Sequence, residues 1–288
     1  MTPRDAFLRA CELDVAVRKP GNVSFLSPGH RMQAAQFIAS AEAAAGPLCA
    51  TGANVGARIE GAVTATWATV GCNTNLGIVL LCAPLAAAAE QPGALASSAA
   101  LRQAAQRVVR ALTIDDAQAA FRAIVQANPA GLGDSAEADV HAPATVTLLE
   151  AMRVAAGHDS IARQYAEGYA DLFELALIAA PAFGFARMAD GEGDERDASV
   201  QRVFLSCLAR WPDSHIVRKH GEAVAQTVIA AAQAWALRKR PGADPAFAAW
   251  DESLKAQGIN PGTSADLTVA SLMIAALVPT AAAAWHGS

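Results

Sequence analysis

The sequence predicts an all-α protein, and three observations support that fold class. Alanine supplies 72 of the 288 residues, and many others are helix-favouring Leu, Gln, Glu and Arg. Apolar residues recur at three- and four-residue spacing along most of the chain, as on one face of a helix. Sustained alternation of β-branched residues, the pattern of strands, is nearly absent. We expect a compact bundle of about ten to twelve helices, forming one domain over residues 1–288, because small alanine side chains let helix backbones approach closely.

The helix spacing recurs in a series of segments separated by turn-forming residues. In chain order, the predicted helices are Pro3–Val17, Arg31–Ala45, Val55–Val70, Leu76–Glu90, Leu95–Ala111, Ile114–Ala127, Ala144–Ala156, Asp159–Ala180, Ala198–Arg210, Ser214–Arg240, Pro245–Gln257 and Ser264–Ala284. Several begin at residues that cap helices well, with Asn75 before Leu76 and Ser264 at the start of the last one. Residues 128–143 and 187–197 have the composition of surface loops.

The last predicted helix raises the question of a membrane segment. Leu267 to Trp285 contains no charged residue over about the length that spans a bilayer. More than a third of it is alanine, which gains little from lipid, and Pro279 interrupts it. We therefore expect a buried core helix. The N-terminus has no apolar stretch typical of a signal peptide.

Composition limits the classes of partner and the compartment. With 22 basic and 27 acidic residues the formal net charge is −5, which argues against broad binding to nucleic acid or anionic lipid. The five cysteines form no CxxC pair and lie in apolar surroundings, as reduced, buried thiols do. Together these features indicate a cytoplasmic protein.

Polar and glycine residues concentrate in a few segments between the predicted helices. They are KPGNV at 19–23 with SPGHRM at 27–32, GCNTNLG at 71–77, DSHIVRKHG at 213–221 and NPGTSADL at 260–267. Helix N-termini in these segments offer free N–H groups that suit a phosphate. The alternative interpretation is that their polar residues only cap helices and form turns.

Two of these segments carry positive charge beside turns or helix starts. Lys19 lies next to a Pro-Gly turn that frees backbone N–H groups. Asp213 or Ser214 caps a helix whose next turn presents Arg218 and Lys219, which suits either a metal-complexed phosphate or an ordinary solvated helix start. Both segments are therefore candidates for anion binding.

Candidate metal ligands are oxygen donors, because no two histidines have the helical spacing of a zinc site and no HExxH motif is present. Mg²⁺ needs only one or two carboxylates together with phosphate oxygens. The acidic candidates are Glu60, Asp134, Glu137, Asp139, Asp213 and Asp266. Glu60 shares a helix face with small and apolar residues, so it is either paired in the core or a functional carboxylate.

Taken in order, these segments resemble one known family. KPGNV, GHRM, Gly56 and Glu60 ahead of GCNTNLG, DSHIVRKHG and NPGTSADL are similar to motifs of the triphosphoribosyl-dephospho-CoA synthases, the ATP:dephospho-CoA triphosphoribosyltransferases. The resemblance spans nearly the full chain, and KPGNV is the version found in a divergent branch. The fold of that family is all-helical, in agreement with the prediction from the residues.

The resemblance implies a transferase of coenzyme biosynthesis. It would move the 5-triphosphoribosyl unit of ATP to the 2′-hydroxyl of 3′-dephospho-CoA and release adenine. Its partners would be these small-molecule substrates, with Mg²⁺ as cofactor. We expect no binding to nucleic acid or to a membrane. The sequence leaves open whether the protein forms a homodimer. Breaking the bond between ribose and adenine builds positive charge on the sugar, so the site needs a carboxylate, a general base and a clamp for the triphosphate.

The implied site residues fall into three groups. The catalytic candidates are Glu60, Asp139 and His30; the nucleotide-binding candidates are Lys19, Gly21, Asn22, Asn73, Thr74, Asn75, Arg218, Lys219, Gly262 and Ser264; the metal candidates are Asp213 and Asp266.

The chain also departs from the family pattern. Arg31 replaces an acidic residue after the GxH element, Asn75 and Leu76 replace a basic pair, and the GxRGEA segment survives only as GLGDSAEADV at 131–140. Two alternative functions follow from these departures. One is a related ribosyl or nucleotide transferase in tetrahydromethanopterin-type one-carbon cofactor biosynthesis, and the other is a nucleotide-binding helical module without turnover.

Overall fold

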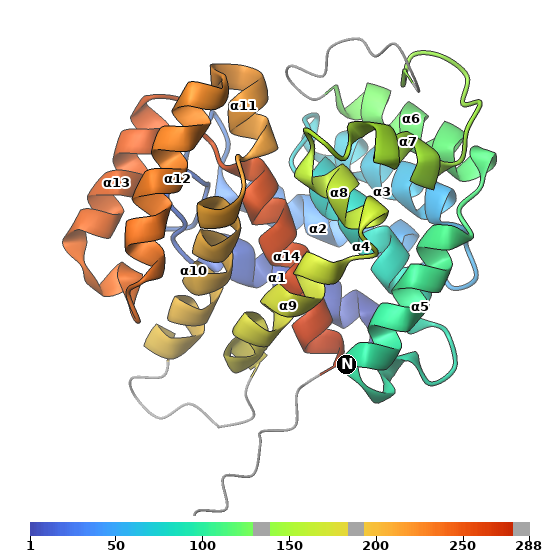
Figure 1. The fold of residues 1–288 in the computed structure, drawn as a ribbon, viewed down its shortest axis with the longest axis horizontal. Coiled ribbons are helices and arrows are strands. Elements are labelled where there is room, and N and C mark those ends of the chain that lie inside the picture. Colours follow the sequence, from blue (N-terminus) through green and yellow to red (C-terminus); the bar gives the residue numbers. More distant parts are fainter. Residues whose placement is uncertain (129–138, 184–192, 279–288) are drawn as a thin grey trace, which may run out of the picture.

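The computed structural model describes residues 1–128, 139–183 and 193–278, and these form helices joined by turns (Figure 1). The α-helices are α1 (Pro3–Ala16), α2 (Ala34–Leu48), α3 (Val55–Val70), α4 (Leu76–Ala89), α5 (Ser98–Arg110), α6 (Ile114–Ala127), α7 (Leu148–Ala155), α8 (Ser160–Ala166), α9 (Ala170–Ala179), α10 (Gly193–Arg210), α11 (Ser214–His220), α12 (Glu222–Ala236), α13 (Pro245–Ala256) and α14 (Gly262–Leu277). Short 3-10 helices occur at Ala94–Ala96, Ala180–Phe183 and Pro241–Ala243. Over these described ranges there is no strand, which confirms the all-α prediction.

The fourteen α-helices found in the described ranges slightly exceed the predicted ten to twelve, because two predicted helices are each divided. Gly168 and Tyr169 adopt φ values of +63° and +64° between α8 and α9, and Gly221 adopts +85° between α11 and α12. Left-handed residues cannot continue a right-handed helix. The predicted second helix also starts later, at Ala34, because His30 and Arg31 have positive φ.

Two predicted loop regions are only partly described. Residues 129–138 and 184–192 lie outside the described ranges, so the loops expected there remain a prediction. The prediction of a loop over 187–197 is wrong from residue 193 onward, because α10 begins at Gly193.

Helix α14 forms the centre of the molecule (Figure 1). It packs against α1, α4, α9 and α10, and from Leu267 to Leu277 every residue is buried. The expectation of a buried core helix is confirmed over this range, while residues 279–288 are not described. None of the helices in the described chain has the length and apolar character needed to cross a bilayer.

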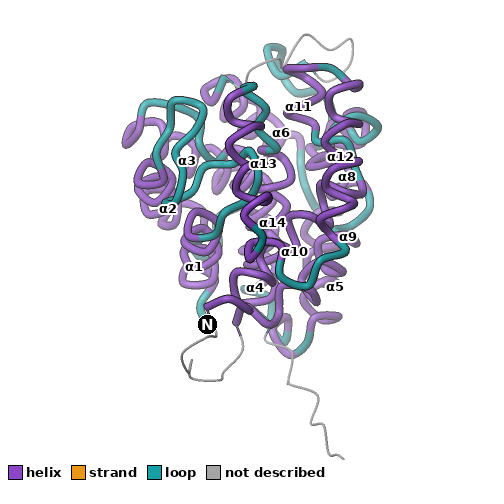
Figure 2. The backbone as a smooth tube through the Cα atoms, turned by 90° about the vertical axis from the view of Figure 1, so that its left-hand side faces the viewer, coloured by secondary structure: helices purple, strands orange, loops and turns teal. Residues whose placement is uncertain are grey.

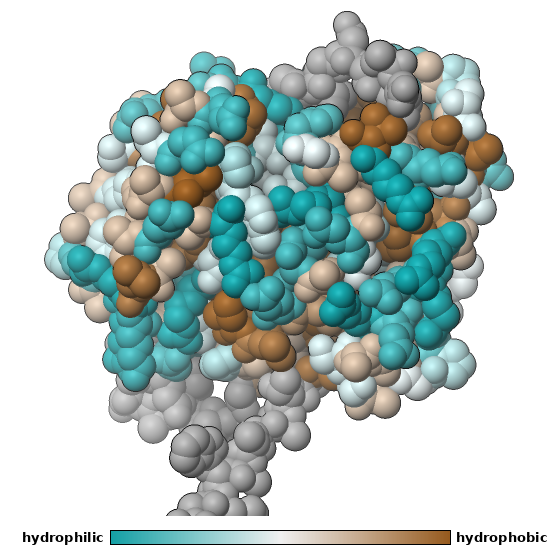
Figure 3. Space-filling model, in the orientation of Figure 1, coloured by the Kyte–Doolittle hydropathy of each residue, from teal (hydrophilic) through white to brown (hydrophobic). Residues whose placement is uncertain are grey.

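Two groups of helices flank α14, and each has its own hydrophobic cluster. On one side, α10 to α13 surround Phe204, Ile216 and Phe247. On the other side, α1 to α9 share the larger cluster, in which α2 packs along α3 and α3 along α6 (Figure 2). On the face shown in Figure 3, hydrophobic residues are scattered among polar ones.

Helix α4 is apolar on all sides and contains a proline, for which the fold compensates. Pro84 has no N–H to donate to the carbonyl of Leu80, four residues earlier. The buried hydroxyl of Tyr165, on α8, donates to that carbonyl instead, and Tyr169 donates to Leu81 O at 3.2 Å. The two tyrosines thereby tie α8 and the start of α9 to α4.

Candidate active site

A cavity of about 540 Å³ lies where the two groups of helices meet. Its walls come from α1, α2, α4, α6, α7, α8, α11 and α14 and from the turns that precede several of them. The polar or charged lining residues are Asp14, Asn22, Asn73, Thr74, Asn75, Asn128, His158, Asp159, His215, Arg218, Asn260, Thr263 and Asp266. Each of the four polar segments singled out in the sequence contributes to this one cavity.

The first and fourth segments meet in a close contact of two Pro-Gly turns. Gly21 has φ +79°, and a Cβ there would lie 2.8 Å from both Ile259 O and Pro261 Cδ, so only glycine fits. Beside it, Asn22 Nδ2 donates to Asn260 Oδ1 at 3.0 Å. This contact places the two asparagine side chains in the cavity wall.

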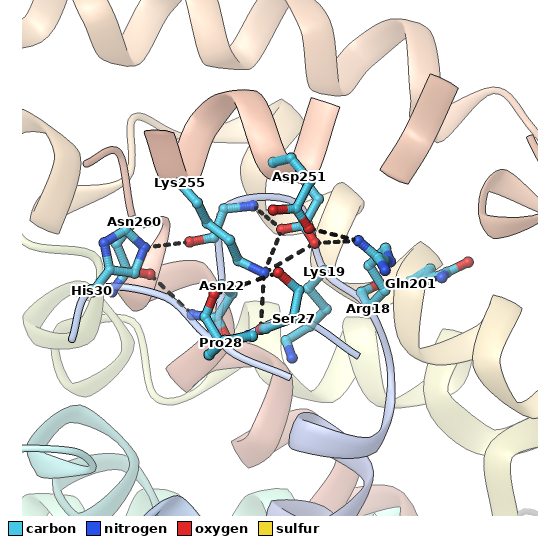
Figure 4. Close-up of polar contacts among 12 residues, drawn as sticks. Arg18, Lys19, Asn22, Ser27, Pro28, His30, Gln201, Asp251, Lys255 and Asn260 are labelled. Carbon is cyan, nitrogen blue, oxygen red and sulfur yellow. Dashed lines mark hydrogen bonds and ion pairs between the residues drawn. The ribbon is translucent and has the colours of Figure 1, made fainter. Parts of the chain in front are cut away.

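Asp251, on α13, stabilises the Lys-Pro-Gly turn through hydrogen bonds to its carboxylate (Figure 4). Its carboxylate accepts from Gly21 N at 2.9 Å, from Arg18 at 2.8 Å and from Lys255 at 3.0 Å. His30 Nε2 lies 2.7 Å from Gly21 O and must donate, because a carbonyl only accepts. Gly21 is therefore part of the turn and His30 stabilises it, and neither residue lines the cavity.

Lys19 is fully buried and directed toward α1. Its Nζ donates to the main-chain oxygen of Asp14 and lies 3.1 Å from Asp14 Oδ1. The structure does not place Lys19 in the cavity lining, but Asp14 is there. Burial raises the pKa of Asp14, and the charge of Lys19 opposes this rise.

The second segment is fixed by a buried polar network. Gly71, at φ +67°, ends α3, and Asn73 Oδ1 accepts from Leu76 N at 3.1 Å at the start of α4. Asn75 Nδ2 donates to Thr66 Oγ1 at 3.0 Å, and Thr74 donates to Ser40 at 2.6 Å. These bonds anchor the turn to α2 and α3, so that residues 73–75 all line the cavity.

Asp213 and Asp266, predicted together as metal ligands, have different surroundings. Both oxygens of Asp213 are occupied: Oδ1 accepts from His215 N and Ile216 N, and Oδ2 accepts from the N–H and hydroxyl of Ser264. This carboxylate joins the starts of α11 and α14. It is buried and does not line the cavity, and neither does Ser264.

Asp266 does line the cavity, and its carboxylate lies directly against Gly77. A Cβ on Gly77 would be only 2.0 Å from Asp266 Oδ2. Within the described ranges, no residue forms a hydrogen bond or ion pair with this carboxylate. Burial, followed by the charges of Asp213, Asp14 and Asp159, raises the pKa of Asp266 well above its ordinary value, while Arg218 opposes the rise.

Arg218 is the only Lys or Arg among the described residues that line the cavity. It donates to Asp159 Oδ2 at 2.9 Å. The other oxygen of Asp159 caps α8 by accepting from Ile161 N and Ala162 N. Asp159 therefore orients the guanidinium beside the cavity.

Three further predicted residues lie away from this lining. Glu60 forms a two-bond ion pair with Arg122 between α3 and α6, at 2.6 and 2.7 Å, and these bonds lower the pKa of Glu60. Lys219 is exposed and donates to Gly258 O at 3.3 Å. Asp139 accepts from His141 N in its own turn, next to the lining residue Val140.

Sequence reasoning missed Asp14 and Asp159. A signal for Asp14 was present, because it falls on the same face of α1 as Phe7, Ala10 and Cys11, where an acidic residue is unexpected. Asp159 has the sequence signature of any N-cap, and its contact with Arg218 joins residues 59 positions apart. No local pattern distinguishes it from other caps.

No group of three or more His, Cys, Asp or Glu side chains in the described part of the chain is arranged to hold a metal ion. A metal held here would need oxygen ligands from a bound phosphate, as Mg²⁺ commonly has. Asp266 is the cavity carboxylate with oxygens free for such a role.

Comparisons with known proteins agree with the fold and give the family. A solved structure from Archaeoglobus fulgidus, assigned as a triphosphoribosyl-dephospho-CoA synthase, has a TM-score of 0.63 over 83% of this chain and 97% of its own, at 21% identity. At that identity it shows a shared fold. No curated protein matches the chain significantly. The model of the family CitG, ATP:dephospho-CoA triphosphoribosyl transferase, matches residues 1–283, and the chain therefore belongs to this family of transferases.

Proposed function

We propose that the cavity between α11, α14 and α6 to α8 is where this transferase moves the triphosphoribosyl unit of ATP to the 2′-hydroxyl of dephospho-CoA. The observation that carries this proposal is the convergence of four polar segments, from Asn22 to Asp266, on one cavity. A volume of about 540 Å³ suits a nucleotide-sized ligand. The family match supports this reaction over a one-carbon cofactor enzyme or a module without turnover.

The lining of the cavity has an apolar part and a polar part. Helices α6 and α7 contribute only apolar side chains: Phe121, Ile124, Leu148, Ala151, Met152 and Ala155. The charged and amide groups come instead from α1, α11 and α14 and from turns that adjoin α2, α4, α6, α8 and α14. An adenine base fits the apolar part, and ribose hydroxyls and phosphates fit the polar part.

The phosphates would be bound by Arg218 together with the first turns of α4 and α14. Gly77, Ile78, Gly262 and Thr263 line the cavity at these helix starts, where N–H groups and the helix dipole favour anions. Arg218 adds a planar cation suited to phosphate oxygens. Because the triphosphate survives the reaction, this binding has only to hold it in place.

Charge balance supports a role for Mg²⁺. Among the described lining residues, Asp14, Asp159 and Asp266 outnumber Arg218 as the one Lys or Arg, so this lining is too acidic to hold a triphosphate unaided. Asp266 would contribute an oxygen ligand, with the remaining ligands coming from phosphate and water. Bound Mg²⁺ would supply positive charge that holds the phosphates next to this carboxylate.

The reaction is tested by incubating the protein with ATP, Mg²⁺ and dephospho-CoA and measuring free adenine. Arg218→Gln removes the cation of the cavity, and we expect it to lower kcat/KM at least about tenfold, the equivalent of 1.4 kcal/mol of lost phosphate binding. Arg238→Gln is the matched control, because Arg238 forms a comparable ion pair with Asp244 on the surface. Equal rates for the two variants, or no adenine from the wild type, would contradict the proposal.

A further inference from the structure

Three carboxylates line the cavity among the described residues, and their surroundings give them different capacities to accept a proton. Asp159 is fully engaged, with one oxygen capping α8 and the other bound to Arg218. Asp266 has no cation of its own within contact distance, and three acidic neighbours oppose its ionisation. A carboxyl in this position holds either a proton or a metal ion. Neither residue is therefore a free proton acceptor.

Asp14 differs from both because a buried ammonium accompanies it. Asp14 is 3% exposed and Lys19 is fully buried, so water screens their attraction little. Lys19 Nζ directs its hydrogen bond to the main-chain oxygen of Asp14 and approaches Oδ1 at 3.1 Å. Apart from this ammonium, the buried Oδ1 has no hydrogen-bond donor among the described residues. The ammonium thus favours the ionised carboxylate against the effect of burial, while the capacity of Oδ1 to accept further hydrogen bonds is unfilled.

We propose, on the basis of the proposed function, that Asp14 is the catalytic base that accepts the proton of the attacking hydroxyl and that Lys19 is its positioning residue. In the transfer step the acceptor oxygen forms a bond to ribose C1′ as the bond from C1′ to adenine N9 breaks. The electron pair of that bond leaves with adenine. The hydroxyl proton passes to the Asp14 carboxylate, and adenine takes up one proton, so protons balance over the cycle.

Several ionisable groups face Asp14 from the elements around it. Lys19 follows on the same segment, Cys11 lies one turn earlier on α1, and Asp266 lies on α14. Burial raises the pKa of Cys11 well above its ordinary value, so this thiol stays neutral. Lys19 is thus the nearby group that favours the ionised form of Asp14, and burial is what opposes it.

The first test compares Asp14→Asn with the wild type under saturating ATP and dephospho-CoA. We expect kcat for adenine release to fall about 10²- to 10⁴-fold, the range for loss of a general base, with little change in ATP binding measured by equilibrium dialysis. Asp14→Glu keeps a carboxylate and should recover part of the rate. Asp115→Asn, at an exposed position on α6, is the control for a surface acid.

The second test uses Lys19→Met and does not depend on the folding of Asp14→Asn. Loss of the ammonium should raise the pKa of Asp14 and so shift the acidic limb of the kcat–pH profile to higher pH, by about one pH unit or more. An unshifted limb in folded Lys19→Met, or a rate within about tenfold of wild type for folded Asp14→Asn, overturns the inference. Absence of adenine release by the wild type would instead reject the proposed function.

Discussion

At the scale of single residues, the contact between Gly77 and Asp266 determines where the free carboxylate of the cavity lies. A Cβ on Gly77 would overlap Asp266 Oδ2 at 2.0 Å, so Gly77→Ala must displace that side chain. We expect the variant to fold and to lose at least about tenfold in kcat, because small displacements in an active site are costly. Adenine release at several Mg²⁺ concentrations measures the effect.

The control at this scale is Gly46→Ala on α2, where a Cβ would meet nothing within 4 Å. It should keep full activity and raise stability by about 0.4–1 kcal/mol, since alanine restricts the unfolded chain. If Gly77→Ala were as active as Gly46→Ala, the position of Asp266 would not matter for the reaction.

Single residues also show what the sequence could and could not predict about the site. Asn73, Asn75 and Asp266 were predicted from polar turns at helix starts, and the structure brings them together. The direction of a side chain was not predictable. Lys19 lies in the right turn but points to Asp14, and Glu60 is paired with Arg122. These partners come from α1 and α6, and short motifs contain no information about such contacts.

At the scale of elements, most helices were predictable and their interruptions were not. The alanine-rich spacing gives the position of α3 and α6 correctly to the residue. The division between α8 and α9 was missed, because the apolar pattern continues through Gly168 and Tyr169. Tyr169 combines a left-handed conformation with a hydrogen bond from its hydroxyl to the Leu81 carbonyl, a contact with α4 that no local pattern indicates.

The link between α8 and α4 is testable by a double-mutant cycle. Tyr165→Phe leaves the buried Leu80 carbonyl unpaired, so we expect a loss of about 1–3 kcal/mol in the free energy of unfolding. Pro84→Ala restores an N–H for that carbonyl within α4. In the Pro84→Ala background, Tyr165→Phe should therefore cost clearly less, as measured by urea unfolding. Equal costs in both backgrounds would show that Tyr165 acts only through packing.

At the scale of the whole molecule, the fold gathers acidic residues around the start of its central helix. Asp14, Asp213 and Asp266 come from α1, the N-cap of α11 and α14, and burial is the largest cause of a raised pKa in each. Positions 14 and 266 are too far apart in sequence for any pattern to predict this convergence. A free-energy cost is thereby concentrated at the site where a metal and phosphates are expected to bind.

This cost predicts how stability depends on pH in the absence of nucleotide and Mg²⁺. Because the folded-state pKa of Asp266 lies above its unfolded value, its contribution is most favourable below about pH 4 and is lost as the pH rises through the folded pKa. Asp266→Asn should therefore raise the free energy of unfolding at pH 7, by about 1.4 kcal/mol per unit of pKa difference, with a smaller gain at pH 4.5. Urea unfolding at both pH values measures this dependence.

Asp213→Asn is the matched comparison. The Asp213 carboxylate accepts four hydrogen bonds, so that variant should be destabilised at pH 7. A stabilisation by Asp266→Asn that does not vary with pH would mean that the cost at Asp266 is not electrostatic.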